Sequence, residues 1–173
     1  QDLGNPLPHS QLTGKPVADA VIWAVAVAGP RRVPKAARAI ADQVGREFVP
    51  HVRPVLVATE VTFPNKDDLR HHVYSFSPAK KFELPLYKGT QAPPVKFEKA
   101  GIVVLGCNIH DWMLGYVYVL DTPYFETTAT DGRARITNVP PGTYGIQLWH
   151  PRLPNGSPPP KQRLTISAGK DER

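Results

Sequence analysis

Proline is the residue type that most restricts the fold of this chain. It accounts for 20 of the 173 residues, which is more than double its usual share of about 5%. Proline has no backbone N–H and clashes with the preceding helical turn, so it interrupts helices. We therefore expect no long helix, and only the alanine-rich stretch 35–43 has the composition for a short helix of about two turns.

Short runs of β-branched and aromatic residues, bounded by Pro, Asn or Asp, recur through the middle of the chain. They lie at 55–57, 61–63, 73–76, 102–105 and 116–120. Several short strands at regular spacing predict an all-β sandwich or barrel with antiparallel pairing. Further strands are expected outside this region, in several cases directly after turns, at 17–25, 133–136, 143–149 and 163–166.

The charge balance is basic, with 21 Lys and Arg against 15 Asp and Glu and a net charge of +6. This balance favours acidic partners. The basic residues form short scattered pairs without the aromatic-interleaved stripe of nucleic-acid binders, so no nucleic-acid partner is expected. No apolar run approaches the roughly 18 residues of a membrane helix, so the chain is not expected to be transmembrane. The start at Gln1 without an initiator methionine suits an exported chain whose signal peptide has been removed.

Sulfur occurs at only two positions, Cys107 and Met113. A single cysteine excludes an intramolecular disulfide, a four-cysteine zinc site and an iron–sulfur cluster held by four thiolates. The two sulfur residues lie in one heptapeptide, 107–113, with His110 between them. Blue-copper sites bind their metal through one Cys and two His, with a weak axial Met. The heptapeptide therefore predicts three of the four ligands of a copper site.

The second histidine of such a site has to come from elsewhere, and the adjacent His71 and His72 precede the expected strand at 73–76. Successive side chains of a strand point to opposite faces, so only one of the two can face the metal. Two other interpretations stay open. The cysteine and histidine of the 107–113 loop could form a nucleophilic pair, which would have no use for the methionine, or the loop could be plain hairpin core.

These motifs are similar to those of cupredoxins, the family of plastocyanin and amicyanin. The 107–113 loop is spaced like the short loop of amicyanin, and Phe63-x-Asn65 followed by His71-x-Val73 resembles the plastocyanin-type segment that supplies the first histidine. The resemblance implies a Greek-key cupredoxin β-sandwich over 47–123. It also implies one mononuclear type 1 copper ion, with the ligands His71, Cys107, His110 and Met113.

The resemblance leaves the role of His72 open, because this residue stands where the family has an asparagine that ties the two ligand loops together. His72 is expected either to do the work of that asparagine or to be the alternative first ligand. The family also implies that electrons enter and leave at an exposed edge of His110. Trp112 would then shield the sulfur from water or serve as plain apolar cover.

The two ends of the chain resemble a different family, the carboxypeptidase regulatory-like or transthyretin-like β-sandwich. The motifs that carry this resemblance are 14–21 near the start and the turns at 131–132 and 140–144 near the end. They imply a second small β-sandwich, built by 10–46 together with 124–173, after a flexible arm at 1–9. The alternative is that these strands extend a single cupredoxin sandwich.

The whole arrangement resembles bacterial methylamine-utilisation and plastocyanin-like proteins, which implies export to the periplasm. The sequence thus predicts a one-electron carrier, not an enzyme. This carrier would meet a redox partner protein, and the basic charge favours an acidic one. The alternative from another class is a periplasmic copper-binding or copper-delivery protein without redox cycling. The oligomeric state does not follow from the sequence.

Overall fold

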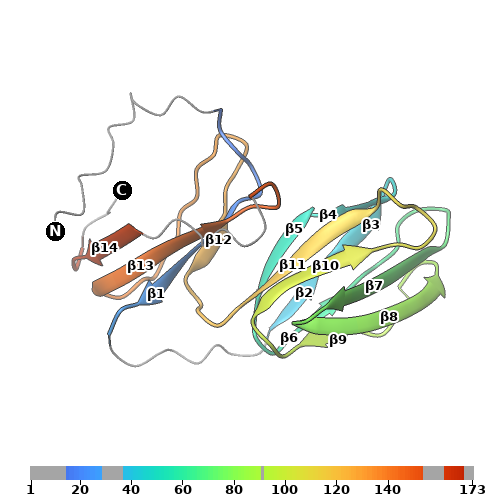
Figure 1. Cartoon of the computed structure of the whole chain (residues 1–173), viewed down its shortest axis with the longest axis horizontal. Coiled ribbons are helices and arrows are strands. Elements are labelled where there is room, and N and C mark those ends of the chain that lie inside the picture. Colours follow the sequence, from blue (N-terminus) through green and yellow to red (C-terminus); the bar gives the residue numbers. More distant parts are fainter. Residues whose placement is uncertain (1–14, 29–36, 91, 154–161, 170–173) are drawn as a thin grey trace.

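A computed structural model describes residues 15–28, 37–90, 92–153 and 162–169 (Figure 1). Within these ranges all regular secondary structure is β-strand, so the all-β prediction is confirmed. No helix long and apolar enough to span a membrane occurs among the described residues. In chain order the strands are β1 (Val21–Ala26), β2 (Arg38–Ile40), β3 (Asp42–Val44), β4 (Glu47–Val49), β5 (Val52–Leu56), β6 (Thr59–Thr62), β7 (His71–Ser77), β8 (Lys80–Tyr87), β9 (Val95–Phe97), β10 (Gly101–Gly106), β11 (Leu114–Leu120), β12 (Phe125–Thr127), β13 (Gly142–Trp149) and β14 (Gln162–Ile166).

The strands form a sandwich and a flanking sheet. The sandwich has a five-stranded sheet of order β5-β11-β10-β7-β8 and a three-stranded sheet of order β2-β6-β9, with the hairpin β3-β4 beside them. Most pairs are antiparallel, as expected, but β5 runs parallel to β11 and β2 runs parallel to β6. The flanking sheet has the order β12-β1-β13-β14.

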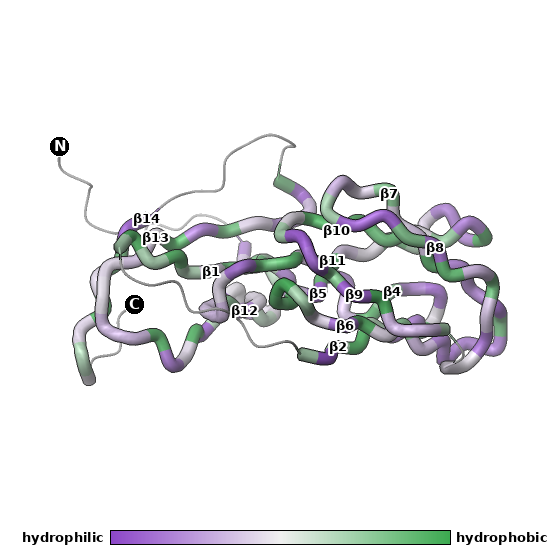
Figure 2. The backbone as a smooth tube through the Cα atoms, turned by 90° about the horizontal axis from the view of Figure 1, so that it is seen from below, coloured by the Kyte–Doolittle hydropathy of each residue, from purple (hydrophilic) through white to green (hydrophobic). Residues whose placement is uncertain are grey.

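The core of the sandwich follows from alternation along its strands, which Figure 2 shows as alternating apolar and polar segments of the tube. On β10, Val103 and Leu105 are buried while Val104 between them is exposed. The buried pair belongs to one apolar cluster that also includes Val61 and Phe97 from the opposite sheet. Burying an apolar side chain of this size stabilises the fold by about 1.5–3 kcal/mol. The two sheets are therefore held face to face.

The flanking sheet joins distant parts of the chain, because β1 pairs with both β12 and β13. It lies at one end of the molecule and the sandwich at the other (Figures 1 and 2). Trp23 of β1 packs against the outer face of β11, where its ring centroid lies 5.1 Å from that of Tyr118. Val21, Val52 and Leu120 complete this second, smaller core. An apolar junction therefore connects the flanking sheet to the sandwich.

The short helix expected at 35–43 is wrong for the described residues 37–43, which carry β2 and β3 instead. The backbone of β2 pairs with β6. Gln43 of β3 is buried and donates a hydrogen bond of 2.8 Å to the carbonyl of Phe63. Such tertiary contacts outweigh the helix preference of alanine, because intrinsic propensity amounts to only a few tenths of a kcal/mol per residue. Residues 35 and 36 lie outside the described part.

The strand expected at 133–136 is also wrong. The turn before it does form, with the backbone N–H of Arg133 donating to Oδ1 of Asp131 over 3.0 Å. Residues 133–136 then continue without strand pairing to any described element. A turn motif brings a segment into position, but the segment forms a strand only where a neighbouring strand is available for hydrogen bonding.

The division of the chain into 47–123 and 10–46 with 124–173 stays a prediction. Strand pairing adds one fact to it: β2 pairs with β6 and β3 pairs with β4, so residues 38–44 join strands that follow them rather than the flanking sheet. The expected arm at 1–9 lies outside the described residues.

Candidate metal centre

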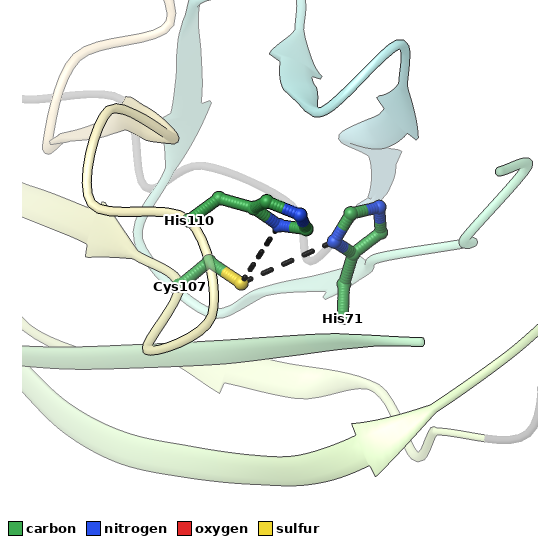
Figure 3. Close-up of side chains that lie close together, drawn as sticks. All are labelled: His71, Cys107 and His110. Atoms are coloured by element: carbon green, nitrogen blue, oxygen red, sulfur yellow. Dashed lines mark hydrogen bonds between the residues drawn. The ribbon is translucent and has the colours of Figure 1, made fainter. Parts of the chain in front are cut away.

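Three buried side chains with metal-binding atoms meet where β7 begins and β10 ends, at the end of the sandwich opposite the flanking sheet (Figure 1). The donor atoms of His71, Cys107 and His110 all lie within 4.8 Å of one another. The sulfur of Cys107 is 4.0 Å from Nδ1 of His71 and 3.9 Å from Nδ1 of His110. Figure 3 shows both imidazole rings turned toward the sulfur.

Strand pairing brings these residues together across 36 positions of the sequence. His71 is the first residue of β7, and Cys107 directly follows β10, which is the neighbour of β7 in the five-stranded sheet. His110 follows in the loop that leads to β11. The backbone N–H of Met113 donates to the carbonyl of His110 over 2.9 Å, which closes this loop as a turn.

The residue before Cys107 has to be small. A Cβ atom added to Gly106 would lie 2.7 Å from Cζ of Tyr74, closer than real carbon contacts. The ring of Tyr74 therefore lies directly on the backbone that leads into Cys107. Glycine at this position lets β7 and β10 approach closely enough for the two ligand-bearing segments to meet.

The spacing of the three donor atoms fits one metal ion. Metal–sulfur and metal–imidazole bonds of about 2.3 and 2.0 Å, at the angles of a trigonal plane, separate sulfur from nitrogen by about 3.7 Å. The observed separations are 3.9 and 4.0 Å. One thiolate and two imidazoles are the trigonal ligand set of blue-copper sites. The residues present can therefore hold one copper ion, as the sequence predicts.

A carboxylate fixes the ring of His71. Nε2 of His71 lies 2.8 Å from Oδ2 of Asp67. A ring nitrogen that faces a carboxylate carries the proton, which leaves the lone pair of Nδ1 available on the side of the sulfur. The His71 side chain is fully buried and the Asp67 side chain is 16% exposed, so water reaches this hydrogen bond only from the carboxylate side.

The same carboxylate binds the turn of the β3–β4 hairpin. Asp67 accepts hydrogen bonds from the backbone N–H groups of Gly45, over 2.6 Å, and Arg46, over 2.8 Å. Burial by itself raises the pKa of Asp67, but the hydrogen bonds from Arg46, His71 and Gly45 outweigh it and hold the pKa below its ordinary value. Asp67 is therefore charged at neutral pH and links the hairpin to a candidate ligand.

Sequence reasoning missed Asp67. The loop that carries it is shaped by Asn65, whose Oδ1 accepts the backbone N–H of Asp67 over 3.0 Å. The Nδ2 group of Asn65 donates to the carbonyls of Leu69 and Tyr87, over 2.8 and 3.0 Å. Asn65 was visible in the plastocyanin-type motif, and an acidic residue between it and the candidate histidine was the available signal.

His72 points away from the cluster. Its Nε2 lies 2.8 Å from Oε1 of Glu83 on β8, and its ring centroid is 5.4 Å from that of Tyr74. The structure therefore brings His71, and not His72, to the two donors of the 107–113 loop. The hydrogen bond of His72 also goes to β8 rather than to that loop, so it does not tie the two ligand loops together as the family's asparagine would.

Met113 is buried in the same apolar core as Cys107. Burial at this position excludes competition from bulk water, which suits a weak thioether ligand. The role of Met113 as the axial ligand stays a prediction.

The expected exposed edge of His110 is narrow, because this residue is 8% exposed, although that is the largest exposed fraction of the three candidate ligands. Trp112 is 66% exposed, and its ring centroid lies 5.4 Å from that of His110 with the two planes at 58°. The tryptophan thus packs on the outer side of an imidazole rather than inside the core. The two roles that the sequence left open for Trp112, a shield of the sulfur or plain apolar cover, are both compatible with this position.

Solved structures provide the comparison with known proteins, since no family model and no curated protein matches the sequence. A purple cupredoxin from Nitrosopumilus maritimus is 24% identical, covering 47% of this chain and 99% of that one with a TM-score of 0.42. A copper-containing nitrite reductase from Thermus scotoductus is 27% identical over 56% of this chain and 25% of that one, with a TM-score of 0.45. A reduced amicyanin variant is 26% identical over 47% of this chain and 80% of that one, with a TM-score of 0.43.

The similar solved structures thus include cupredoxins, the family that the sequence motifs resemble. Each similarity extends over about half of this chain. The geometry of His71, Cys107 and His110, rather than these partial similarities, carries the functional conclusion.

Proposed function

We propose that the protein is a one-electron carrier with a single copper ion bound by His71, Cys107 and His110. The observation that carries this proposal is the buried cluster itself, in which one sulfur and two imidazole nitrogens lie within 4.8 Å of one another. Met113 is proposed as the weak fourth ligand, because thioether sulfur at the axial position belongs to this class of site.

Copper in such a site supplies a one-electron couple between Cu(II) and Cu(I). The chain's own contribution is to hold the ligands still. Asp67 keeps a proton on Nε2 of His71, so Nδ1 stays available in both oxidation states. Cys107 and His71 are both buried, which limits the access of water and other ligands to the centre. A fixed ligand set that excludes substrates favours a carrier over an enzyme.

The cellular setting is also a proposal. Export to the periplasm follows from the resemblance to methylamine-utilisation and plastocyanin-like proteins. A redox partner protein is required by the reaction, since an electron taken up has to be passed on. The net charge of +6 supports an acidic partner, because oppositely charged surfaces steer encounter.

The visible absorption spectrum of the copper-loaded full chain tests the proposal. A thiolate bound to Cu(II) is expected to give an intense band at roughly 450–600 nm. Cys107→Ser should abolish this band because it removes the sulfur, and His71→Ala should abolish or strongly shift it. His72→Ala is the matched control and should retain it, since that ring faces Glu83. Absence of the band in the unmodified chain would contradict the proposal.

Voltammetry separates electron carriage from copper delivery. A carrier should show a reversible one-electron wave, because its ligands barely move between the two oxidation states. A chain that binds Cu(I) through Cys107 but shows no reversible wave would be a copper-binding or copper-delivery protein instead.

A further inference from the structure

His110 is the least enclosed of the three candidate ligands. It is 8% exposed, against 0% for His71 and 3% for Cys107. Solvent therefore approaches the cluster from the His110 side. A small molecule that reaches the sulfur from that side has to pass the His110 imidazole.

An aromatic residue occupies this side of the cluster. The indole of Trp112 contacts the His110 ring at 5.4 Å between centroids, while the largely exposed remainder of Trp112 faces solvent. His110 also contacts the buried ring of His71, at 5.0 Å. The imidazole thus has one aromatic neighbour inside the cluster and one outside it.

These two ring contacts restrain the His110 side chain without using its hydrogen-bonding atoms. Among the described residues, the hydrogen-bonding contact of the His110 ring is Nδ1 with the sulfur of Cys107, at 3.9 Å. His71, in contrast, has a carboxylate partner for its second nitrogen. Tilted aromatic contacts favour one ring orientation over others. The rotamer of His110 therefore depends on Trp112 in a way that the rotamer of His71 does not.

We propose that Trp112 is a positioning residue: its indole holds the His110 ring beside Cys107 and closes the solvent side of the cluster. Small polar reagents then reach the sulfur only when the indole moves aside. Any effect of Trp112 on electron transfer rests on the proposed function. The cover itself is a property of the metal-free chain and can be measured there.

Alkylation of Cys107 by iodoacetamide in the metal-free full chain tests this inference. The thiolate displaces iodide, so a sulfur–carbon bond forms, a carbon–iodine bond breaks and the thiol proton goes to solvent. Mass spectrometry follows the reaction at its one possible site, the single cysteine. Trp112→Ala should raise the rate about tenfold, because thiol reactivity follows exposure. Trp112→Phe, which keeps a ring on His110, should stay within about twofold of the unmodified chain.

Two controls separate the cover from a general loss of stability. Phe76→Ala removes an exposed aromatic side chain of β7 and should leave the rate unchanged. Denaturant unfolding of each variant shows whether alkylation follows global opening instead. Trp112 is largely exposed, so its variants are expected to fold, and Trp112→Leu provides a second substitution without a ring.

An alkylation rate that is unchanged in both Trp112→Ala and Trp112→Leu would overturn the proposal. It would also be overturned if Trp112→Phe raised the rate as much as these two variants do. Failure of the proposed function looks different. The copper-loaded chain would then lack its intense visible band, while the alkylation rates of the metal-free chain would still follow the substitutions at Trp112.

Discussion

The metal end of the sandwich and its junction with the flanking sheet are stabilised by different interactions. At the metal end, the carboxylate of Asp67 accepts hydrogen bonds from His71 and from two backbone N–H groups of a hairpin turn. At the junction, Trp23 and Trp149 contact Tyr118 at ring distances of 5.1 and 5.2 Å. The hydrogen bonds of Asp67 fix the direction of a candidate ligand, whereas the ring contacts at the junction bury apolar area. We therefore expect the junction to determine stability and the metal end to determine copper binding.

The largest expected effect on stability is at the junction. Trp23→Ala should lower the free energy of unfolding by about 3–5 kcal/mol, because it removes a buried aromatic side chain and leaves a cavity. Denaturant unfolding measures the loss. Val27→Ala, an exposed position just after β1, is the control and should change stability by less than about 0.5 kcal/mol. The visible copper band of Trp23→Ala should stay as it is, and a shifted band would show that the two regions are coupled.

A smaller loss of stability with a larger effect on copper is expected for Asp67→Ala. The copper affinity should fall about 10–100-fold, because His71 loses the partner that fixes its ring. The free energy of unfolding of the metal-free chain should fall by about 1.5–3 kcal/mol, since three donors lose a charged acceptor. Competition with a chelator measures the affinity.

Asp68→Ala is the matched control for Asp67→Ala, because Asp68 is fully exposed and its partner is the Nζ of Lys88 at 3.2 Å. It should leave copper affinity unchanged. Equal copper affinities of the two variants would show that copper binding through His71 does not depend on the Asp67 carboxylate.

The smallest expected effect is a pH dependence of the junction. Burial, with a contribution from the charge of Asp121, raises the pKa of Tyr118 to about 12. In the unfolded chain this phenol titrates near its ordinary value of about 10. The stability that follows from the raised pKa is thus present below about pH 10 and is lost as the pH rises toward 12. The unmodified chain should lose more unfolding free energy over this range than Tyr118→Phe, and parallel curves would exclude Tyr118 as the cause.

The sequence predicted the chemistry of the site better than its surroundings. Cys107 and His110 were found because the only cysteine, the only methionine and a histidine share one short loop. Strand alternation showed only that one of two adjacent histidines can face the metal, and the resemblance to the plastocyanin-type segment implied that it is His71. Asp67 was missed, because its partners are a ring and a hairpin turn whose positions depend on sheet packing.

The corrected elements share a cause. Residues 38–44 form strands because β6 and β4 offer them pairing partners, and residues 133–136 do not form one because no described strand does. Pairing partners far away in the chain are invisible to local propensity. The same limit applies to the exposed fractions of His110 and Trp112, which depend on how the folded loop packs.

By itself, the sequence of this chain determined which atoms can bind a metal, because thiol, imidazole and thioether groups are properties of residues and their spacing is local. It also determined the all-β class, because 20 prolines and short β-branched runs leave little room for helices. Only the tertiary structure decided which histidine joins Cys107, which carboxylate orients it and which aromatic ring covers the site. Those choices depend on pairing between β7 and β10 and on loop contacts across tens of residues, where packing rather than local preference sets the free energy.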